Sequence, residues 1–277
     1  MNKEQRKSQV YFCPTPIGNL EDITLRTLRI LEEVDVILCE DTRHSIPLLN
    51  HYEIKKPLIS YHKYNEQARV DEILERLEQG ETIAVISDAG MPGVSDPGEV
   101  LIGKLIEKEI SYEVLPGPSA HVVATVAANI PEGRYTFWGF LPQKAGEREK
   151  ILKQWENSPL PMAFYEAPHR MEKTIASIEK ILGKRNLVLA RELTKLYEGI
   201  VFTNTEDFLK SPEDFTLKGE FVLLLMPKEA GEETVDIQKE LQKKLDEGMK
   251  MSQAVKAVAK EQNLPKNAVY KESLEME

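Results

Sequence analysis

A short polar stretch, Ser87 to Gly90, directly follows an apolar run, Ile83 to Ile86. The run is short and partly β-branched, so it predicts a buried strand. Glycines and prolines continue as far as Gly98, and their density predicts a folded loop. Ligands of open α/β sheets bind beyond the carboxyl ends of strands, where Asp88 would lie. The stretch is therefore a candidate site for a small polar ligand, although a strand-to-helix turn with an Asp cap has the same composition.

Three other apolar runs end in loops of comparable character. The run Val10 to Cys13 is followed by the loop Pro14 to Asn19. The run Val34 to Cys39 is followed by Glu40 to Arg43, and the run Tyr112 to Leu115 by Pro116 to Ala120. Two acids, a hydroxyl and an arginine crowd the second loop, which is typical of a strand end that lines a cleft. A capped helix start with a solvated ion pair has the same residues. Together the loops strengthen the ligand-site interpretation.

Helical spacing of apolar residues alternates with these strands in the first half of the chain. Repeated strand–loop–helix units predict a mostly parallel sheet. The helix after Ala120 carries small residues, so it can approach a neighbour or a ligand closely. No G-x-G-x-x-G follows the first strand and no P-loop motif is present, which disfavours a nicotinamide cofactor and a P-loop nucleotide site.

The pattern changes near Asn129 to Gly133, which is a plausible domain border. Later predicted strands are more closely spaced and indicate a second α/β domain with a mixed sheet: Tyr135 to Leu141, Met162 to Tyr165, Leu187 to Ala190, Gly199 to Thr203 and Glu220 to Met226. From Pro227 the chain turns polar, which predicts a linker and a small helical tail. We expect domains at residues 1–129 and 130–227, a ligand cleft between them, and an appendage at 228–277.

Composition sets limits on partners. The 277 residues carry a net charge of −10, which argues against nonspecific nucleic-acid binding without a local basic face. Basic residues that could form such a face gather in the predicted second domain: Lys144, Arg148, Lys150, Lys153, His169, Arg170, Lys173, Lys184, Arg185, Arg191 and Lys195. Cys13 and Cys39 are expected to be buried thiols, and no metal site is expected. Without a signal-like or membrane-spanning run, we expect a cytoplasmic protein.

Seven motifs in order resemble the tetrapyrrole methylase superfamily, and in particular its bacterial branch that methylates a cytidine ribose 2′-hydroxyl in small-subunit ribosomal RNA. The motifs are PTPIGNLEDITLRTL from Pro14, CEDTR from Cys39, SDAGMPGVSDPG from Ser87, LPGPSA from Leu115, FYEAPHR from Phe164, ARELTK from Ala190 and KGEFVLL from Lys218. Porphyrin and corrin methylases usually carry Gly-Asp-Pro where this chain has Ser87-Asp88-Ala89. That departure favours the ribosomal branch over a tetrapyrrole substrate.

The resemblance implies a homodimeric two-domain α/β methyltransferase that binds S-adenosylmethionine in the interdomain cleft. It implies cofactor contacts from the first domain and from the second. Those contacts are Pro16, Gly18, Asp88, Ala89, Gly90, Met91, Ser119, Ala120, Tyr165, Ala167, Leu193 and Gly219.

A base would help to remove the ribose proton. Glu166 and Asp41 are the leading candidates, with His169 and Lys195 also considered. The residues expected to contact RNA are Arg43, His169, Arg170 and Lys195. Two alternatives remain open: a methylase of a tetrapyrrole or other small molecule, and a non-catalytic RNA-binding protein on the same fold.

Overall fold

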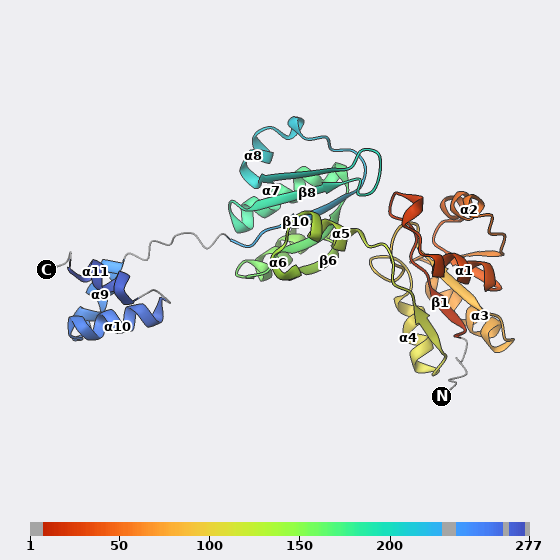
Figure 1. Cartoon of the computed structure of the whole chain (residues 1–277), viewed down its shortest axis with the longest axis horizontal. Coiled ribbons are helices and arrows are strands. Elements are labelled where there is room, and N and C mark those ends of the chain that lie inside the picture. Colours follow the sequence, from red (N-terminus) through yellow and green to blue (C-terminus); the bar gives the residue numbers. More distant parts are fainter. Residues whose placement is uncertain (1–7, 229–236, 263–265, 275–277) are drawn as a thin grey trace. The chain divides into compact units, whose positions relative to one another are not determined.

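The computed structural model describes residues 8–228, 237–262 and 266–274, and the chain divides into two compact units. The first unit spans residues 1–227 and contains two five-stranded sheets, whereas the second spans residues 228–277 and is helical where described (Figure 1). The predicted α/β class with a helical C-terminal stretch is confirmed. A domain border at residue 129, inside the first unit, stays a prediction.

The first sheet is entirely parallel and has the strand order β3-β2-β4-β1-β5. Its strands are β1 (Val10–Phe12), β2 (Val36–Cys39), β3 (Leu58–Ser60), β4 (Ile83–Ile86) and β5 (Tyr112–Val114). The run Ile83–Ile86 is central, because Ile83 pairs with Val10 on one side and with Val36 on the other. β2 begins later than expected, because the amide of Val34 caps the preceding helix by donating to Ile30.

Four helices connect these strands and cover both faces of the sheet: α1 (Leu25–Glu33), α2 (Thr42–His51), α3 (Glu66–Glu78) and α4 (Glu99–Glu107). The short turn η1 (Leu20–Asp22) precedes α1, whereas helix α5 (Ala120–Ala127) and the turn η2 (Pro131–Gly133) follow the last strand. Alternate residues of β1 face opposite cores: Phe12 lies in one buried cluster and Tyr11 in the other. Thr24 caps α1 by accepting from the amide of Thr27, so α1 begins after η1.

The second sheet is mixed and has the strand order β6-β7-β10-β8-β9. Its strands are β6 (Thr136–Phe140), β7 (Met162–Glu166), β8 (Asn186–Arg191), β9 (Gly199–Asn204) and β10 (Phe221–Leu225), and only β6 and β7 pair in parallel. One face carries the core shared with α6 (Ala145–Trp155), α7 (Met171–Leu182) and α8 (Thr205–Lys210), near the turns η3 (Pro168–Arg170) and η4 (Pro212–Asp214).

Helix α5 packs against β7 and β10 of the second sheet. Ala124 and Ala128 lie in the same buried cluster as Ala163, Val222 and Leu224. Small side chains let a helix approach a sheet closely, as the sequence indicated. Because α5 follows the last strand of the first sheet, it joins the two sheets within one unit.

The second unit is a bundle of three helices around a small apolar core. They are α9 (Ile237–Asp246), α10 (Met251–Glu261) and α11 (Lys266–Leu274), and the core consists of Leu241, Ala254, Val255, Val258 and Val269. Most of the predicted linker lies outside the described residues. No helix in the described parts is long and apolar enough to cross a membrane.

Candidate active site

Two loops that follow the adjacent strands β1 and β4 are bonded to each other. Thr15 and Gly90 form an antiparallel bridge with N–H···O distances of 2.9 and 3.0 Å. The Thr15 hydroxyl donates to the Ser87 carbonyl at 3.0 Å, and the Ser87 hydroxyl donates to the Gly90 carbonyl at 2.9 Å. Gly90 has a φ of 85°, which glycine adopts at little cost. These bonds fix the backbone on both sides of Asp88.

A cavity of about 370 Å³ opens beside this loop. Its walls come from the loops after β1, β2, β4, β5, β7 and β8, from the segment before β10, and from strands β6, β7, β8 and β10. The lining residues are Ile17, Glu40, Asp88 to Met91, Val94 to Asp96, Ser119, Ala120, Phe140, Tyr165 to Pro168, Ala190, Leu193 and Gly219 to Val222. The position agrees with the rule that ligands bind beyond the carboxyl ends of parallel strands.

Three carboxylates from the first sheet's loops line the cavity: Glu40, Asp88 and Asp96. Burial, with the nearby charges of Glu40 and Asp88, raises the pKa of Asp96 to about 7. Burial and the charge of Asp88 also raise the pKa of Glu40. Grouped negative charges in a partly buried site favour either a proton or a cationic ligand, because each charge destabilises its neighbours.

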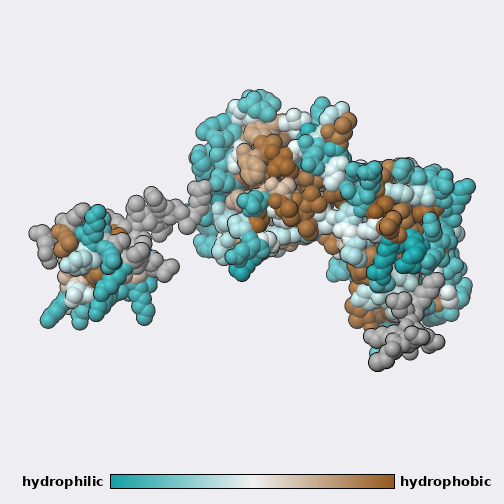
Figure 2. Space-filling model, viewed as in Figure 1, coloured by the Kyte–Doolittle hydropathy of each residue, from teal (hydrophilic) through white to brown (hydrophobic). Residues whose placement is uncertain are grey.

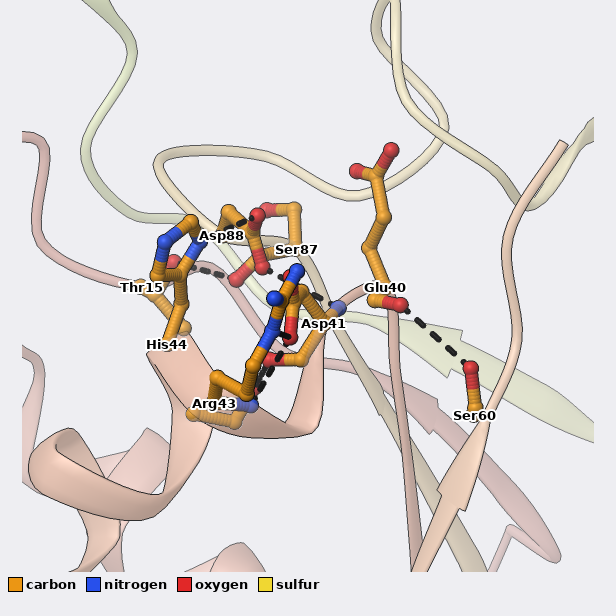
Figure 3. A network of polar contacts seen from close by, with 9 residues as sticks. Thr15, Glu40, Asp41, Arg43, His44, Ser60, Ser87 and Asp88 are labelled. Atoms are coloured by element: carbon orange, nitrogen blue, oxygen red, sulfur yellow. Dashed lines mark hydrogen bonds and ion pairs between the residues drawn. The ribbon is translucent and has the colours of Figure 1, made fainter.

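Asp88 contacts the start of helix α2 (Figure 3). Its Oδ2 atom lies 2.9 Å from Nδ1 of His44, and its Oδ1 atom accepts from the amide of Asp41 at 3.4 Å. The bond to Asp88 raises the pKa of His44. The side chain of Glu40 extends away from this group in Figure 3. Asp88 is thus oriented by α2, while Glu40 takes no part in that contact.

Ten of the residues predicted to contact a cofactor line the cavity: Asp88, Ala89, Gly90, Met91, Ser119, Ala120, Tyr165, Ala167, Leu193 and Gly219. Segments far apart in sequence are brought together here, as the two-domain interpretation required. Pro16 and Gly18 are not among the lining residues, although their neighbour Ile17 is. Lining a cavity does not itself assign a ligand, so the cofactor roles stay predictions.

Gly18 lies where the loop after β1 packs closely against the segment after β8. A Cβ atom built there would lie 2.7 Å from Oγ1 of Thr194 and 2.8 Å from the carbonyl of Leu193, and would also meet Lys195. The amide of Asn19 donates to Oγ1 of Thr194 at 3.0 Å. The loop after β1 therefore packs directly on the segment after β8, and Leu193 of that segment lines the cavity.

The structure argues against Glu166 as a base. Its side chain is completely buried, and Oε1 accepts from the amide of Ala167 at 2.9 Å and pairs with Nε of Arg170 at 2.9 Å. Oε2 accepts from the Thr174 hydroxyl at 2.6 Å. Because both oxygens are engaged, the carboxylate is a structural anchor for the loop after β7.

Asp41 is also poorly suited to accept a proton. Both of its carboxylate oxygens bond to the Arg43 guanidinium, at distances of 2.5 to 3.1 Å, and it caps α2. These bonds hold the pKa of Asp41 well below its usual range. A carboxylate with so low a pKa is a weak base, and Asp41 is not among the residues that line the cavity.

Of the side chains expected to contact RNA, some are exposed to solvent and others are bonded to groups inside the protein. His169 is exposed and can reach a ligand. The side chain of Arg43 is 86% exposed, so it can reach a ligand while its guanidinium stays paired with Asp41. Arg170 is only 15% exposed, and its guanidinium bonds to Glu166 and to the carbonyl of Leu141. Lys195 pairs with Glu192 and Glu220 at 2.9 and 2.7 Å. Arg170 is therefore an internal structural residue rather than a phosphate contact.

Two of the basic residues expected to form a wider basic face in the second domain are buried. Arg148 is buried and bonds to Ser177 and to the carbonyls of Pro142 and Gln143. Arg185 is buried as well. Sequence composition could not separate these buried cations from exposed ones.

Sequence reasoning missed Asp96 as a site residue, although it stands in the quoted SDPG segment. No hydrogen bond to its carboxylate is present in the part of the chain that the structure describes. Its neighbour Ser95 has a φ of 68°, and its Oγ would lie 2.8 Å from a Cβ added at Gly139. Backbone strain of this kind clusters at functional loops.

The cavity combines the three carboxylates with an apolar wall that includes Met91, Val94, Phe140, Leu193 and Phe221. Such a site suits a small molecule with a positive charge and a flat apolar portion. A parallel sheet and a mixed sheet that together enclose such a cavity are typical of α/β enzymes that bind a small molecule.

Comparison with known proteins assigns the family. Residues 9–209 match the sequence model of the Tetrapyrrole (Corrin/Porphyrin) Methylases. The chain belongs to this family and is a methyltransferase, and the family's methyl donor is S-adenosylmethionine. The residues of the cavity fit that cofactor, since carboxylates can hold its cationic groups and the apolar wall can hold its adenine.

Relatives and solved structures are consistent with this assignment. The chain is 42% identical to "Ribosomal RNA small subunit methyltransferase I" of Pasteurella multocida, covering 96% of each chain. It is 36% identical to the protein of the same name from Halalkalibacterium halodurans, covering 95% of this chain and 94% of the relative. The methyltransferase CobJ shares the fold at 21% identity and a TM-score of 0.62, covering 80% of this chain and 95% of CobJ. Diphthine synthase does so at 11% identity and a TM-score of 0.64, covering 79% of this chain and 90% of that chain.

Proposed function

We propose that this protein transfers a methyl group from S-adenosylmethionine to the 2′-hydroxyl of a cytidine ribose in small-subunit ribosomal RNA. The observation that carries the proposal is the cavity with three carboxylates at the strand ends, in a chain whose relatives are named for ribosomal RNA methylation. The Ser87-Asp88-Ala89 sequence, in place of Gly-Asp-Pro, supports an RNA substrate over a tetrapyrrole.

Residues on both sides of the cavity would hold the cofactor. Asp88 and Glu40 offer negative charge to its cationic groups, while Met91, Leu193 and Phe221 offer apolar contacts. When bound, S-adenosylmethionine supplies an electrophilic methyl group on a positively charged sulfur. The chain's main contribution is alignment, and holding reactants in line can contribute about 7–11 kcal/mol.

Asp96 is the residue best placed to accept the proton that the ribose hydroxyl loses. It lines the cavity, and its pKa of about 7 makes it half ionised near neutral pH. A general base works best when its pKa is close to the working pH. One Oδ atom of Asp96 would take the proton, whereas the oxygens of Glu166 and Asp41 are already bonded to other groups.

Two further parts of the proposal concern partners. Arg43 and His169 are exposed and would contact RNA phosphates near the cavity. Exposed apolar side chains on α5 and β6, namely Val122, Val123, Val126, Trp138 and Phe140, support a homodimer through this part of the first unit. Figure 2 shows apolar surface over this region. Light scattering of the purified chain tests the dimer, and a monomer at micromolar concentration contradicts it.

The experiment that tests the activity uses methyl-labelled S-adenosylmethionine and small ribosomal subunits from cells that lack the protein. Nuclease digestion and mass spectrometry then locate the label. Label on a cytidine ribose is the expected result. Cofactor binding without transfer to RNA would favour a small-molecule acceptor, and RNA binding that is indifferent to the cofactor would favour a non-catalytic role.

A further inference from the structure

The described helices of the three-helix unit carry more lysines than acids, although residues 228–277 as a whole contain nine lysines and eleven acidic residues. Its described residues, 237–262 and 266–274, contain eight lysines and five acidic residues, whereas the whole chain has a net charge of −10. Figure 2 shows a largely hydrophilic surface on this unit. A local surplus of lysine on a small folded unit is the electrostatic footprint expected of a polyanion-binding surface.

Most of these lysines are accessible and free of acidic partners. Lys243, Lys250, Lys256, Lys260, Lys266 and Lys271 are exposed. Within the described ranges no ion pair reaches any of these six. The acidic residue Glu261 is instead occupied by Lys244, at 3.0 Å. Glu272 accepts from the side chain of Gln238 at 3.1 Å. The positive charge therefore stays available at the surface.

Helices α10 and α11 carry four of these six lysines. Val258 of α10 and Val269 of α11 lie in the shared core, and the two helices are in contact. Lys256 and Lys260 are four residues apart, so they share one face of α10. On α11 the exposed residues include Lys266, Asn267, Tyr270 and Lys271, while Val269 and Ser273 are buried.

The composition of the α11 face matches contacts to nucleic acid. Lysine amines pair with phosphates, while the amide of Asn267 and the phenol of Tyr270 can reach sugars or bases. α10 ends at Glu261 and α11 begins at Lys266, a spacing found in helix-turn-helix units. Val269 anchors α11 in the core of this unit.

We propose that residues 237–274 form an RNA-docking module whose surface consists of Lys256, Lys260, Lys266, Tyr270 and Lys271, and that this surface binds the phosphate backbone of a helical segment of the substrate RNA. The proposal rests on the proposed RNA substrate. It adds a binding surface outside the cavity, which gives the acidic chain the local basic face that such a substrate requires.

The test compares charge-neutralised variants of the full chain. One variant carries Lys256→Gln and Lys260→Gln, and a second carries Lys266→Gln and Lys271→Gln. The matched control carries Lys55→Gln and Lys108→Gln, which remove the same charge from exposed positions of the first unit. Glutamine is a good helix former, and unchanged circular dichroism would show that the bundle is intact.

Filter binding measures the affinity for a structured fragment of small-subunit ribosomal RNA at several salt concentrations. Each lysine pair that contacts phosphates should reduce the slope of log affinity against log salt by about 2, while the control slope stays unchanged. Equal losses in all three variants would indicate bulk charge and overturn the proposal, as would unchanged slopes in both test variants. Tighter binding of duplex DNA than of RNA would also overturn it.

Methyl transfer separates this proposal from the proposed function. With subunits as substrate, both test variants should raise KM and leave kcat and the calorimetric affinity for S-adenosylmethionine unchanged. Wild-type protein that binds structured RNA through these lysines but transfers no methyl group to it would overturn the activity and leave the surface in place. Normal transfer with unaltered salt slopes would overturn only the surface.

Discussion

Nδ1 of His44 lies 2.9 Å from Oδ2 of Asp88, so a side chain near the start of α2 holds the carboxylate that follows the central strand (Figure 3). The contact joins the loops after β2 and β4, which lie side by side in the sheet. The bond raises the pKa of His44, because the ionised carboxylate favours the charged ring. Folding stability from this pair is therefore present at low pH and is lost as the pH rises through the raised pKa.

Cofactor affinity should depend on the protonation of His44. Below its pKa the charged ring occupies Asp88, and above it Asp88 is free to bind a cation. We expect the affinity for S-adenosylmethionine, measured by calorimetry, to increase as the pH rises through the His44 pKa, which lies above 6.5. His44→Gln should weaken this dependence and leave the part that comes from ionisation of Asp96, and His51→Gln, on the same helix, should retain it in full. An identical pH profile in both variants would contradict the competition.

Replacing Asp88 tests the cavity as the cofactor site. Asp88→Asn removes the negative charge but keeps the size of a side chain that lines the cavity. We expect at least a tenfold loss of affinity for S-adenosylmethionine by calorimetry, because hydrogen bonds to charged groups contribute about 1.5–3 kcal/mol. The thermal unfolding midpoint should change little. Unchanged affinity would place the cofactor elsewhere.

Asp96→Asn should slow methyl transfer without abolishing cofactor binding. General bases typically contribute about 10²–10⁴-fold to rate, and asparagine cannot accept the proton. Activity requires the ionised carboxylate, so the wild-type rate should rise with pH and level off above the Asp96 pKa of about 7. The variant should lack this inflection in a single-turnover pH profile. Glu99→Gln, an exposed acid just beyond the loop, is the control, and a full rate in Asp96→Asn would exclude the role.

The buried pair of Glu166 and Arg170 should matter for folding. Removing one partner of a buried ion pair typically costs about 3–5 kcal/mol, because the other charge is left uncompensated. Arg170→Ala should therefore lower the urea midpoint of the first unit. Arg134→Ala breaks an exposed pair with Glu132 and should cost about 0–1 kcal/mol. A changed salt slope of RNA binding in folded Arg170→Ala protein would instead support a phosphate contact.

Gly18→Ala should disturb the contact between the loop after β1 and the segment after β8. The added methyl group meets Thr194 Oγ1 at 2.7 Å and the Leu193 carbonyl at 2.8 Å, so backbone must move. Overpacking of this kind costs about 1–3 kcal/mol, and the shift of Leu193 should also weaken cofactor binding. Gly103→Ala in α4 meets no atom within 4 Å and should stabilise by about 0.5–1 kcal/mol. Equal unfolding midpoints for the two variants would contradict this interpretation.

Much of the fold was predictable because its signals are local. The apolar run Ile83–Ile86 and the glycine-rich loop after it predict a central strand and a ligand-binding end; the strand is present, and the loop lines a cavity. Observed strand boundaries differ from the predicted ones by one or two residues where a residue caps a helix instead of joining the strand, as Val34 does. The alanines of α5 indicated close packing but did not reveal its partner, since β7 and β10 are distant in sequence.

By itself, the sequence determined the family, the α/β class, the order of strands and loops, and about half of the residues that line the cavity, because hydropathy period and motif order are properties of neighbouring residues. Only the tertiary structure decided which charged groups are available. Glu166 and Arg170 neutralise each other inside the protein, whereas Asp96 lies near Asp88 of its own loop and near Glu40 of the loop after β2. The reactivity of a carboxylate depends on its burial and on the charges around it, and those neighbours come from strands far apart along the chain.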